Sequence, residues 1–501
     1  MNIYTLISSR ILKKFRQDCI DIEKNYRHTY ANILKIVKWH KFSDTNIESL
    51  KELPFTEYSD YESFFEKALQ TKINPLTGEK VLFFLKSTGS TGKQKYIPLT
   101  KSYSKNYLSS LISRGAVLQK TFNIFKMQHQ HAFFIPGVEL INGLPSGHMG
   151  LYLYNKVPSF FRSKWALPIE IANNVSLYQK YGDTLVVLRD LDALSGTIPG
   201  GLNAFYERIV QNKLEIIKQI KNPDTVMAKY ISLNKKITKS RILYVENVLS
   251  KDKLSLNELW PKIKFLSFWK AGAGESQLLT IRHILDEETE IIDQVYNSTE
   301  GAFNIPWPNK IGGPVLPKGI ILEFLDVNSG ITYFPWQLTI GKEYELLVTN
   351  FIGMLRYRIG DYVKCTGFYE NSPEIHFISR KNNEISFGWY TISLADLNKY
   401  LAEMKCLMNN CIVAPNPSMM GLSIYWQKVR PLNEEKIISE FLIKSIPYFE
   451  ERLKDGTAKS LTCYEIPANL FNLWKITAKS AAEKALPEKI KSYILSLHNS
   501  L

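Results

Sequence analysis

The sequence predicts an α/β fold with a large N-terminal domain, part of which is β-rich, and a smaller α+β domain at the C-terminus. Three observations support this prediction. Strand and helix patterns alternate over 263–295, strand patterns dominate over 319–379, and helices and strands mix again in the remaining part of the chain. Because the character of the sequence changes after Arg380, we expect two domains, 1–379 and 380–501.

The elements of the N-terminal half follow from the spacing of apolar residues. Apolar residues recur every three to four positions through 9–50, which predicts helix. Apolar runs at 81–99 and 131–141 predict strands. A polar, basic stretch at about 203–240 predicts a long helix, which follows a turn of Pro and Gly at 199–201.

The next elements are a strand at 263–269, a helix at about 276–286 and a strand at 291–295. The β-rich part contains five short apolar runs that we interpret as strands, at 319–325, 344–348, 355–359, 362–368 and 375–378. In the C-terminal domain, helical spacing predicts helices near 393–404, 434–445 and 477–496.

The composition is that of a globular protein. Of 501 residues, 45% are apolar and 22% are charged, and no stretch approaches the roughly 18 apolar residues that a membrane helix needs. The first residues lack the basic leader and apolar core of a secretion signal. Five scattered cysteines without a CxxC pair indicate reduced thiols. We therefore expect a cytoplasmic protein with no membrane partner.

The net charge is +15, and lysines concentrate between 213 and 241. This segment lacks the interleaved aromatic residues and the recognisable module of a nucleic-acid binder, so we interpret it as a solvated helix face and expect no nucleic-acid partner. The positive charge also favours anionic substrates such as nucleotides. His129 and His131 could begin a metal site, but no further cluster with ligand spacing follows, so ordinary packing is favoured.

A loop rich in hydroxyl groups, glycine and lysine lies at 87–95, between two apolar strand patterns. Its glycines permit backbone conformations that point several N–H groups at one anion, and its lysines add positive charge. It is not a Walker A loop, because Ser87 stands where the first glycine is required and Gln94 follows Lys93. A flexible linker is the alternative, but linkers are rare between two strands. We expect a phosphate-binding loop, with a helix that starts around Thr100 or Ser102.

A second polar group, Tyr296–Gly301, directly follows the predicted strand at 291–295. The carboxyl ends of strands in α/β sheets are common ligand sites. Glu300 could bind a Mg²⁺ ion that also contacts nucleotide phosphates, and Tyr296 could stack on a base. An ordinary turn with a solvated Glu is the alternative.

The third group is Leu355–Asp361, in which Arg356 and Arg358 alternate with apolar residues along a predicted strand. A carboxylate fixed at the end of that strand, such as that of Asp361, can accept hydrogen bonds from both hydroxyls of a ribose. The alternative is a turn in which Asp361 caps backbone N–H groups.

The order of these groups resembles the motif series of adenylate-forming enzymes. Within that superfamily, the chain is most similar to the Gretchen Hagen 3 family of acyl acid amido synthetases, in its bacterial branch. The motifs that carry the resemblance are Leu53–Phe55, Asp60–Glu62, 87–100, Trp260–Pro261, Gly272–Gly274, Tyr296–Glu300, Tyr357–Asp361, Thr366–Phe368, Pro373, Phe377–Arg380 and Ile466–Ala468 with Phe471 and Trp474. The resemblance implies a large N-terminal adenylate-forming domain with mixed sheets, and a small mobile C-terminal cap.

By position, the resemblance also implies an ATP site. Its nucleotide-binding residues would be Ser87, Thr88, Gly89, Ser90, Thr91, Gly92, Lys95, Gly272, Tyr296, Asn297, Ser298, Thr299, Asp361 and Arg380. The loop with Lys95 would hold the phosphates, Tyr296 and its neighbours would frame adenine, and Asp361 would hold the ribose. Arg380 would mark the hinge. Glu300 would bind Mg²⁺ and, with Lys484, form the catalytic pair.

The C-terminal lysine departs from the family pattern, in which Lys precedes Val or Thr, Pro and Arg. Here Lys484 stands one position early, and Glu488 replaces the Arg. Either Lys484 substitutes through a local shift, or the first half-reaction is slowed or altered. A surface-helix lysine is the alternative.

The implied activity joins a carboxylic acid to an amino acid. The acid would be adenylated by ATP with release of pyrophosphate, and the amine would then displace AMP. Two alternatives remain open: transfer of the acyl group to a thiol of coenzyme A or a protein, and nucleotide binding without catalysis. The acid pocket is expected in helices within 102–165.

Overall fold

The structure is a computed structural model. It describes residues 3–40, 46–87, 95–158, 162–197, 199–233, 237–271, 278, 281, 284–286, 288–380, 384–387, 390–393, 411–415, 421–426, 432–446, 449–456, 458, 461–465 and 467. None of the helices in these ranges combines the length and the apolar character that crossing a bilayer requires.

Helices form the start of the chain. α1 (Ile3–Ile20) and α2 (Ile22–Ile36) are followed by the 3-10 helix η1 (Ile47–Glu52) and by α3 (Tyr58–Thr71). The helix predicted at 9–50 is confirmed as far as Ile36, with a break at Asp21 where the backbone leaves the helical region, but it was wrong at 37–40, which are not helical.

The first sheet has the strand order β2-β1-β5-β4. β1 (Val81–Ser87) and β2 (Lys95–Thr100) form an antiparallel hairpin, whereas β5 (Leu144–Gly147) pairs with β1 in parallel and with β4 (Glu139–Ile141) in the antiparallel sense. This sheet is therefore mixed. α4 (Lys101–Phe122) follows β2 and packs against α1.

The second sheet is parallel, with the order β3-β6-β7-β8. Its strands are β3 (Gln130–Ala132), β6 (Ala193–Ser195), β7 (Phe265–Phe268) and β8 (Glu290–Asp293). One face packs on a large apolar cluster with helices α8 (Val175–Leu188), α9 (Gly200–Lys221) and α11 (Lys239–Leu249). The other face packs near η2 (Ile124–Lys126).

Two predicted elements in this region were too long. The strand predicted at 131–141 is divided between β3 and β4, which belong to different sheets, because Pro136 and Gly137 interrupt it. The helix predicted at 203–240 consists of α9, α10 (Thr225–Leu233) and the start of α11. Pro223 lacks the N–H that would continue α9.

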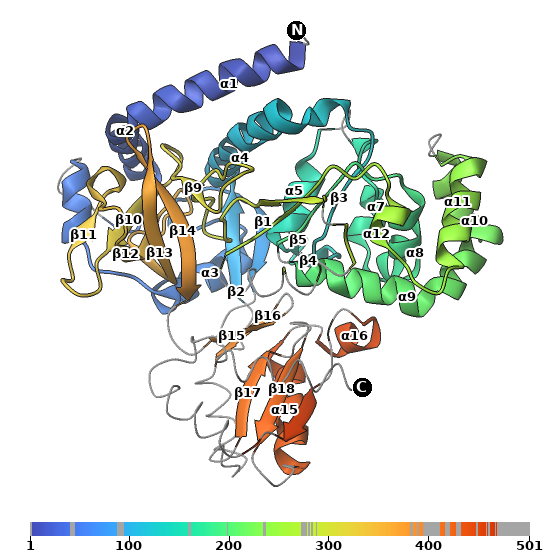
Figure 1. Cartoon of the computed structure of the whole chain (residues 1–501). Helices are drawn as coiled ribbons and strands as arrows, with labels where there is room; N and C mark the ends of the chain where they lie inside the picture. Colours follow the sequence, from blue (N-terminus) through green and yellow to red (C-terminus); the bar gives the residue numbers. More distant parts are fainter. Residues whose placement is uncertain are drawn as a thin grey trace.

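The predicted β-rich part is confirmed as a six-stranded sheet of order β11-β10-β12-β13-β14-β9, which lies beside the first two sheets in Figure 1. Its strands are β9 (Gly313–Pro314), β10 (Ile321–Leu325), β11 (Thr332–Tyr333), β12 (Glu343–Thr349), β13 (Tyr357–Tyr369) and β14 (Ser372–Arg380). The strands predicted at 355–359 and 362–368 are a single strand, β13.

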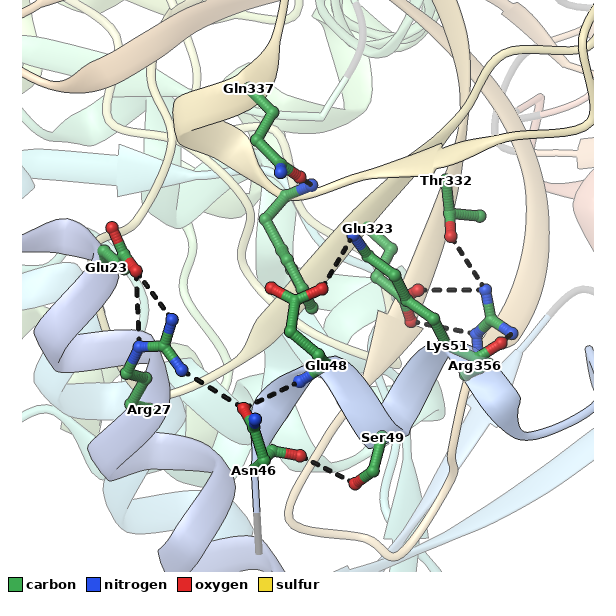
Figure 2. A network of polar contacts seen from close by, with 11 residues as sticks. Glu23, Arg27, Asn46, Glu48, Ser49, Lys51, Glu323, Thr332, Gln337 and Arg356 are labelled. Carbon is green, nitrogen blue, oxygen red and sulfur yellow. Dashed lines mark hydrogen bonds and ion pairs between the residues drawn. The ribbon is translucent and has the colours of Figure 1, made fainter.

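Arg356 ties this sheet to the segment at Lys51 and Leu53, and Figure 2 shows its contacts with Glu323 and Thr332 of the sheet. It lies just before β13 in the left-handed region (φ +46°), and its guanidinium pairs with Glu323 of β10 at 3.0 Å. The same group donates to Thr332 of β11 at 3.0 Å and to the carbonyl oxygens of Lys51 and Leu53 at 2.7 and 2.5 Å. The buried Arg356 is thus a structural link, and the prediction that it belongs to a regular strand pattern was wrong.

The C-terminal part has small sheets and an apolar cluster of its own. β15 (Glu384–Phe387) pairs with β16 (Tyr390–Ser393), and the other sheet has the order β17-β18-β19. Its elements are β17 (Cys411–Pro415), β18 (Leu422–Trp426), α15 (Leu432–Ser445), α16 (Phe449–Lys454) and β19 (Thr462–Glu465). α15 confirms the helix predicted at 434–445. The helices predicted at 393–404 and 477–496, and most of that at 276–286, lie outside the described residues. The boundary at 379/380 stays a prediction.

Candidate active site

The predicted phosphate loop joins the two strands of a hairpin. Ser87, the last residue of β1, is paired with Lys95, the first residue of β2, so residues 88–94 connect the strands at the hairpin's end. This confirms the predicted strand–loop–strand arrangement. Thr88, Gly89, Ser90, Thr91 and Gly92 themselves lie outside the described residues. The ammonium group of Lys95 lies 4.6 Å from the ring centre of Tyr58.

The helix after the loop begins where it was predicted to begin. α4 starts at Lys101, and the side chain of Thr100 caps it by accepting a hydrogen bond from the N–H of Tyr103 at 3.4 Å. Tyr103 and Tyr107, one helical turn apart, lie on the buried side of α4. Burial is the main cause that raises the pKa of both hydroxyls, and the nearby negative charge of Glu300 raises it further. Both groups therefore act as neutral hydrogen-bonding groups.

The two tyrosines hold the predicted Tyr296–Gly301 group. This group forms a tight turn after β8, in which the N–H of Ser298 donates to the carbonyl of Gly301 at 2.8 Å. The hydroxyl of Tyr103 donates to the carbonyl of Thr299 at 2.6 Å, and Asn297 Nδ2 donates to the hydroxyl of Tyr107 at 2.6 Å. The turn is thus fixed by the helix that follows the phosphate loop.

Glu300 is half-buried in this turn. Its Oε2 accepts hydrogen bonds from the hydroxyls of Ser298 at 2.6 Å and Thr299 at 2.9 Å, and its main-chain oxygen accepts one from Asn350 at 2.9 Å. Within the described part of the chain, no hydrogen bond reaches its Oε1. The turn therefore offers a carboxylate oxygen beside two hydroxyl groups, a set of hard oxygen donors that suits Mg²⁺.

Tyr58 interacts with both Lys95 and Glu300. Burial is the main cause that raises the pKa of Tyr58 to about 12, and the charge of Glu300 contributes to that rise. The same phenol ring carries the Lys95 ammonium on its face. Lys95, which follows the predicted phosphate loop, and Glu300 are therefore both within interaction range of Tyr58, although they are 205 positions apart (300 − 95).

The third predicted group joins the same site. Tyr296 donates its hydroxyl hydrogen to Asp361 Oδ2 at 2.6 Å, and Asp361 is buried, with 4% of its surface exposed. The Tyr296 ring packs edge-on against Phe303 and lies 5.5 Å from the ring of Phe377. Gly360, directly before Asp361 in β13, has a φ of +81°, a left-handed conformation that glycine adopts readily.

Asp361 also lies beside the end of β14, since its backbone is paired with that of Arg380. The side chain of Arg380, together with Gly272 and Lys484, lies outside what the structure describes. Of the three predicted groups, the acidic turn and Asp361 are therefore in direct contact. Of the predicted phosphate loop, Lys95 contacts Tyr58, on which the charge of Glu300 also acts, and residues 88–94 lie outside the described part of the chain.

Sequence reasoning missed four residues that shape the site: Tyr58, Tyr103, Tyr107 and Asn350. A signal was present for two of them, because Tyr103 and Tyr107 are spaced i, i+4 directly after the loop. His129 and His131 are packing residues, as predicted. His131 is buried, and burial next to Arg208 lowers its pKa to about 3. Among the described residues, no group of three or more His, Cys, Asp or Glu side chains could hold a metal ion.

The fold places the chain in a known class of protein. It superposes on the solved structure titled "AtGH3.15 acyl acid amido synthetase in complex with 2,4-DB" with a TM-score of 0.68 and 17% identity, over 96% of this chain and 93% of the other. A second structure, titled "GH3.15 acyl acid amido synthetase", superposes with a TM-score of 0.64 and 19% identity, over 94% of this chain and 93% of the other. The chain therefore has the α/β fold of these two acyl acid amido synthetase structures, as predicted.

Sequence comparison then gives the family. Residues 32–289 match the GH3 family N-terminal domain, and residues 313–380 match the GH3 family central domain. The chain belongs to the GH3 family, which confirms the predicted family.

Curated relatives are plant enzymes. The jasmonoyl–L-amino acid synthetase JAR4 of Nicotiana attenuata is 23% identical over 423 residues, which are 75% of this chain and 72% of that protein. The indole-3-acetic acid-amido synthetase GH3.4 of Arabidopsis thaliana is 23% identical over 389 residues, 70% of this chain and 64% of that protein. The 4-substituted benzoates-glutamate ligase GH3.12 of Arabidopsis thaliana is 22% identical over 392 residues, which are 72% of this chain and 68% of that protein.

Proposed function

We propose that this protein is an ATP-dependent acyl acid amido synthetase that joins a small carboxylic acid to an amino acid. The observation that carries the proposal is the contact between Tyr296 and Asp361 beside the Glu300 turn, which Tyr103 of α4 holds in place. This geometry fits one nucleotide, and the relatives of the chain are named as acid–amino acid synthetases and ligases.

In this proposal each motif binds one part of the nucleotide. Asp361 accepts hydrogen bonds from the ribose, and the Tyr296 hydroxyl fixes the orientation of that carboxylate. The ring of Tyr296, with residues 297–299 beside it, frames adenine. Ser87 to Gly92 and Lys95 hold the phosphates. Gly272 and Arg380 complete the nucleotide-binding set.

Glu300 is proposed to hold Mg²⁺ through its Oε1, with the hydroxyls of Ser298 and Thr299 holding the other carboxylate oxygen in place. A bound Mg²⁺ would neutralise charge on the phosphates of ATP during transfer. The hydrogen bond from the Tyr103 hydroxyl to the carbonyl of Thr299 fixes the position of this turn relative to α4.

The proposed reaction has two steps. A carboxylate oxygen of the acid attacks the α-phosphorus of ATP, and the bond to the bridging oxygen breaks, which gives acyl-AMP and pyrophosphate. The neutral amine of the amino acid then attacks the acyl carbon, loses a proton, and expels AMP as the amide forms. Both steps rely on positioning and charge stabilisation, so no protein nucleophile is required.

The C-terminal part is proposed to act as a mobile cap that hinges after Arg380 and exchanges the two half-reactions. Lys484 is proposed to enter the site during adenylation, in place of the lysine at the usual family position. In the present structure α16 lies against α8, where Gln179 donates to Asp455 at 3.4 Å. A cap that rotates must release this contact.

Two finer assignments complete the proposal. The motif at 466–468, with Phe471 and Trp474, supports a place in the bacterial branch of the family. Cys19, Cys365 and Cys463 are free thiols, which supports a cytoplasmic location.

A screen of carboxylic acids against amino acids tests the function, with acid-dependent pyrophosphate release and amine-dependent AMP release as separate readouts. Glu300→Ala should abolish both at any Mg²⁺ concentration. Glu343→Ala is the matched control, because Glu343 is an exposed carboxylate on β12 of the β-rich sheet, and it should leave both unchanged. Release of AMP that depends on coenzyme A and not on an amine would favour the thiol alternative. If no acid releases pyrophosphate, the proposal is wrong.

A further inference from the structure

One side of the N-terminal region is rich in basic side chains. It is formed by α1, by α4, which packs against α1, and by η2. Residues 3–17 contain four Lys or Arg residues, residues 101–128 contain five, and neither segment contains Asp or Glu. In Figure 1, α1 lies along the edge of the molecule opposite the C-terminal strands β17 and β18.

α1 has two different faces. Its buried residues, Ser8, Phe15 and Cys19, recur at helical spacing on the side that faces the rest of the protein. The opposite side begins with Ile3, Leu6 and Ile7, which are 65%, 37% and 46% exposed. The same side continues at helical spacing with three exposed cations, Arg10, Lys13 and Lys14.

α4 and η2 extend this surface. Ile112 of α4 is 55% exposed, and Lys101, Lys105, Lys120 and Lys126 are exposed. Two other cations of the same segments do not contribute, because Arg114 is buried and Arg16 is paired with Glu370 at 2.7 Å. The tip of α1 is fixed to this region by the stacking of Tyr4 on Phe125, with ring centres 4.6 Å apart.

We propose that the outer side of α1, with the exposed cations of α4 and η2, is a docking surface for an anionic lipid bilayer. Helices that lie in a membrane interface combine apolar side chains, which enter the boundary of the acyl chains, with Lys and Arg that meet anionic headgroups. Ile3, Leu6 and Ile7 supply the first kind of contact, and Arg10, Lys13 and Lys14 supply the second. Such a helix lies on the bilayer and needs no membrane-spanning segment. The sequence-based expectation of no membrane partner rested on the lack of a span.

The surface fits a bilayer better than two other partners. Nucleic acid would match the cations but has no apolar region to cover exposed aliphatic side chains. A second copy of the chain would bring two like-charged surfaces together. The lysine-rich α9–α11 region is different, because acidic side chains are interspersed there: Lys218 lies 3.7 Å from Glu215, and Lys221 lies 3.8 Å from Glu246.

Docking through α1 would leave the candidate active site accessible. The C-terminal elements lie on the other side of the molecule in Figure 1, so a bilayer against α1 would not obstruct their movement. The docking proposal is argued from α1, α4 and η2 alone, so it does not depend on the proposed function.

Flotation with lipid vesicles tests the proposal, with the full chain carrying its tag at the C-terminus so that α1 is unobstructed. One set of vesicles contains phosphatidylcholine with about one-third phosphatidylserine, and the other contains phosphatidylcholine alone. The first variant reverses the cations of α1 (Arg10→Glu, Lys13→Glu, Lys14→Glu), and the second removes its exposed aliphatics (Ile3→Gln, Leu6→Gln, Ile7→Gln). The matched control reverses three lysines elsewhere, with the same change in net charge (Lys218→Glu, Lys221→Glu, Lys229→Glu).

The unaltered chain should partition into the anionic vesicles at least about tenfold more strongly than into neutral ones, and the partition should fall as salt rises. Each α1 variant should lose at least about tenfold, and the lysine control should stay within about twofold. Circular dichroism and pyrophosphate release should be unchanged in all three variants. The proposal fails if the chain does not bind anionic vesicles, or if the α1 variants and the control lose binding equally. It also fails if the α1 variants abolish only capture of a mixed-sequence RNA probe or concentration-dependent dimerisation.

Discussion

The contact between Asp361 and the ribose gives the sharpest test of the candidate site. Asp361 is 4% exposed, and one of its oxygens is held by the Tyr296 hydroxyl at 2.6 Å, so its carboxylate is oriented and almost completely shielded from water. A hydrogen bond from a neutral hydroxyl to such a charged group contributes about 1.5–3 kcal/mol. At about 1.4 kcal/mol per factor of ten, removing one ribose hydroxyl should lower kcat/KM about 10- to 150-fold.

The assay is acid-dependent pyrophosphate release with three nucleotides: ATP, 2′-deoxy-ATP and 3′-deoxy-ATP. The unaltered enzyme should prefer ATP over each deoxynucleotide by about 10- to 150-fold. Asp361→Ala should reduce both preferences to about threefold or less, and Asp361→Asn should give intermediate values because an amide oxygen still accepts a weaker hydrogen bond.

The preference for ATP over the deoxynucleotides distinguishes a loss of ribose binding from structural damage to the protein. A variant that is only misfolded in part loses rate with all three nucleotides and keeps its preference for ATP. Glu343→Ala, on the neighbouring strand β12, serves as the control and should keep both rate and preference. If Asp361→Ala still discriminates against both deoxynucleotides as the unaltered enzyme does, Asp361 does not bind the ribose and the assignment must be abandoned.

Three further predictions follow from other contacts. Arg356→Met should lower the free energy of unfolding by about 3–5 kcal/mol, because it leaves the carboxylate of Glu323 buried without its partner. In urea unfolding, the double variant Arg356→Met with Glu323→Leu should lose much less stability than the single variant. Equal losses in the two variants would contradict this explanation. Tyr103→Phe removes the donor to Thr299 and should raise the Mg²⁺ concentration needed for half-maximal pyrophosphate release, with only about 0.5–1.5 kcal/mol lost in stability; an unchanged Mg²⁺ requirement would argue against this role. Burial lowers the pKa of His131 from 6.5 to about 3, so between these pH values only the unfolded chain takes up a proton. The free energy of unfolding should therefore decrease as the pH decreases, by up to about 1.4 kcal/mol per pH unit. His131→Phe should flatten that slope between pH 6.5 and 4.5, and identical slopes for the two proteins would contradict the assignment.

The local parts of the site were predictable from the sequence. The strand–loop–strand at 81–100 follows from two apolar runs around a segment of small polar residues, and the start of α4 follows from the capping preference of Thr100. The position of the turn with Glu300 after a buried strand was also correct. These features depend on neighbours in the sequence, so local patterns are enough to reveal them.

The contacts between distant segments were not predictable in the same way. Nothing in the sequence near Arg356 indicates that it leaves the strand, because its conformation is set by the carbonyl groups of Lys51 and Leu53, some 300 positions earlier. The break between α9 and α10 is a different case, since Pro223 was visible in the sequence and should have divided the predicted helix.

α4 explains how the site can work as one unit. The phosphate loop leads through β2 directly into α4, and the hydroxyl groups of Tyr103 and Tyr107 hold the turn that carries Glu300. Further along the same helix, Arg114 donates to the carbonyl of Asp293 at 2.5 Å, at the end of the strand that leads into the turn. A displacement of β2 would therefore reach the turn with Glu300 through α4, because Tyr103, Tyr107 and Arg114 bond to the turn and to the strand before it. For this reason we expect substitutions of the two tyrosines to change nucleotide and metal requirements together, whereas independent binding of phosphate and metal would allow each requirement to change alone.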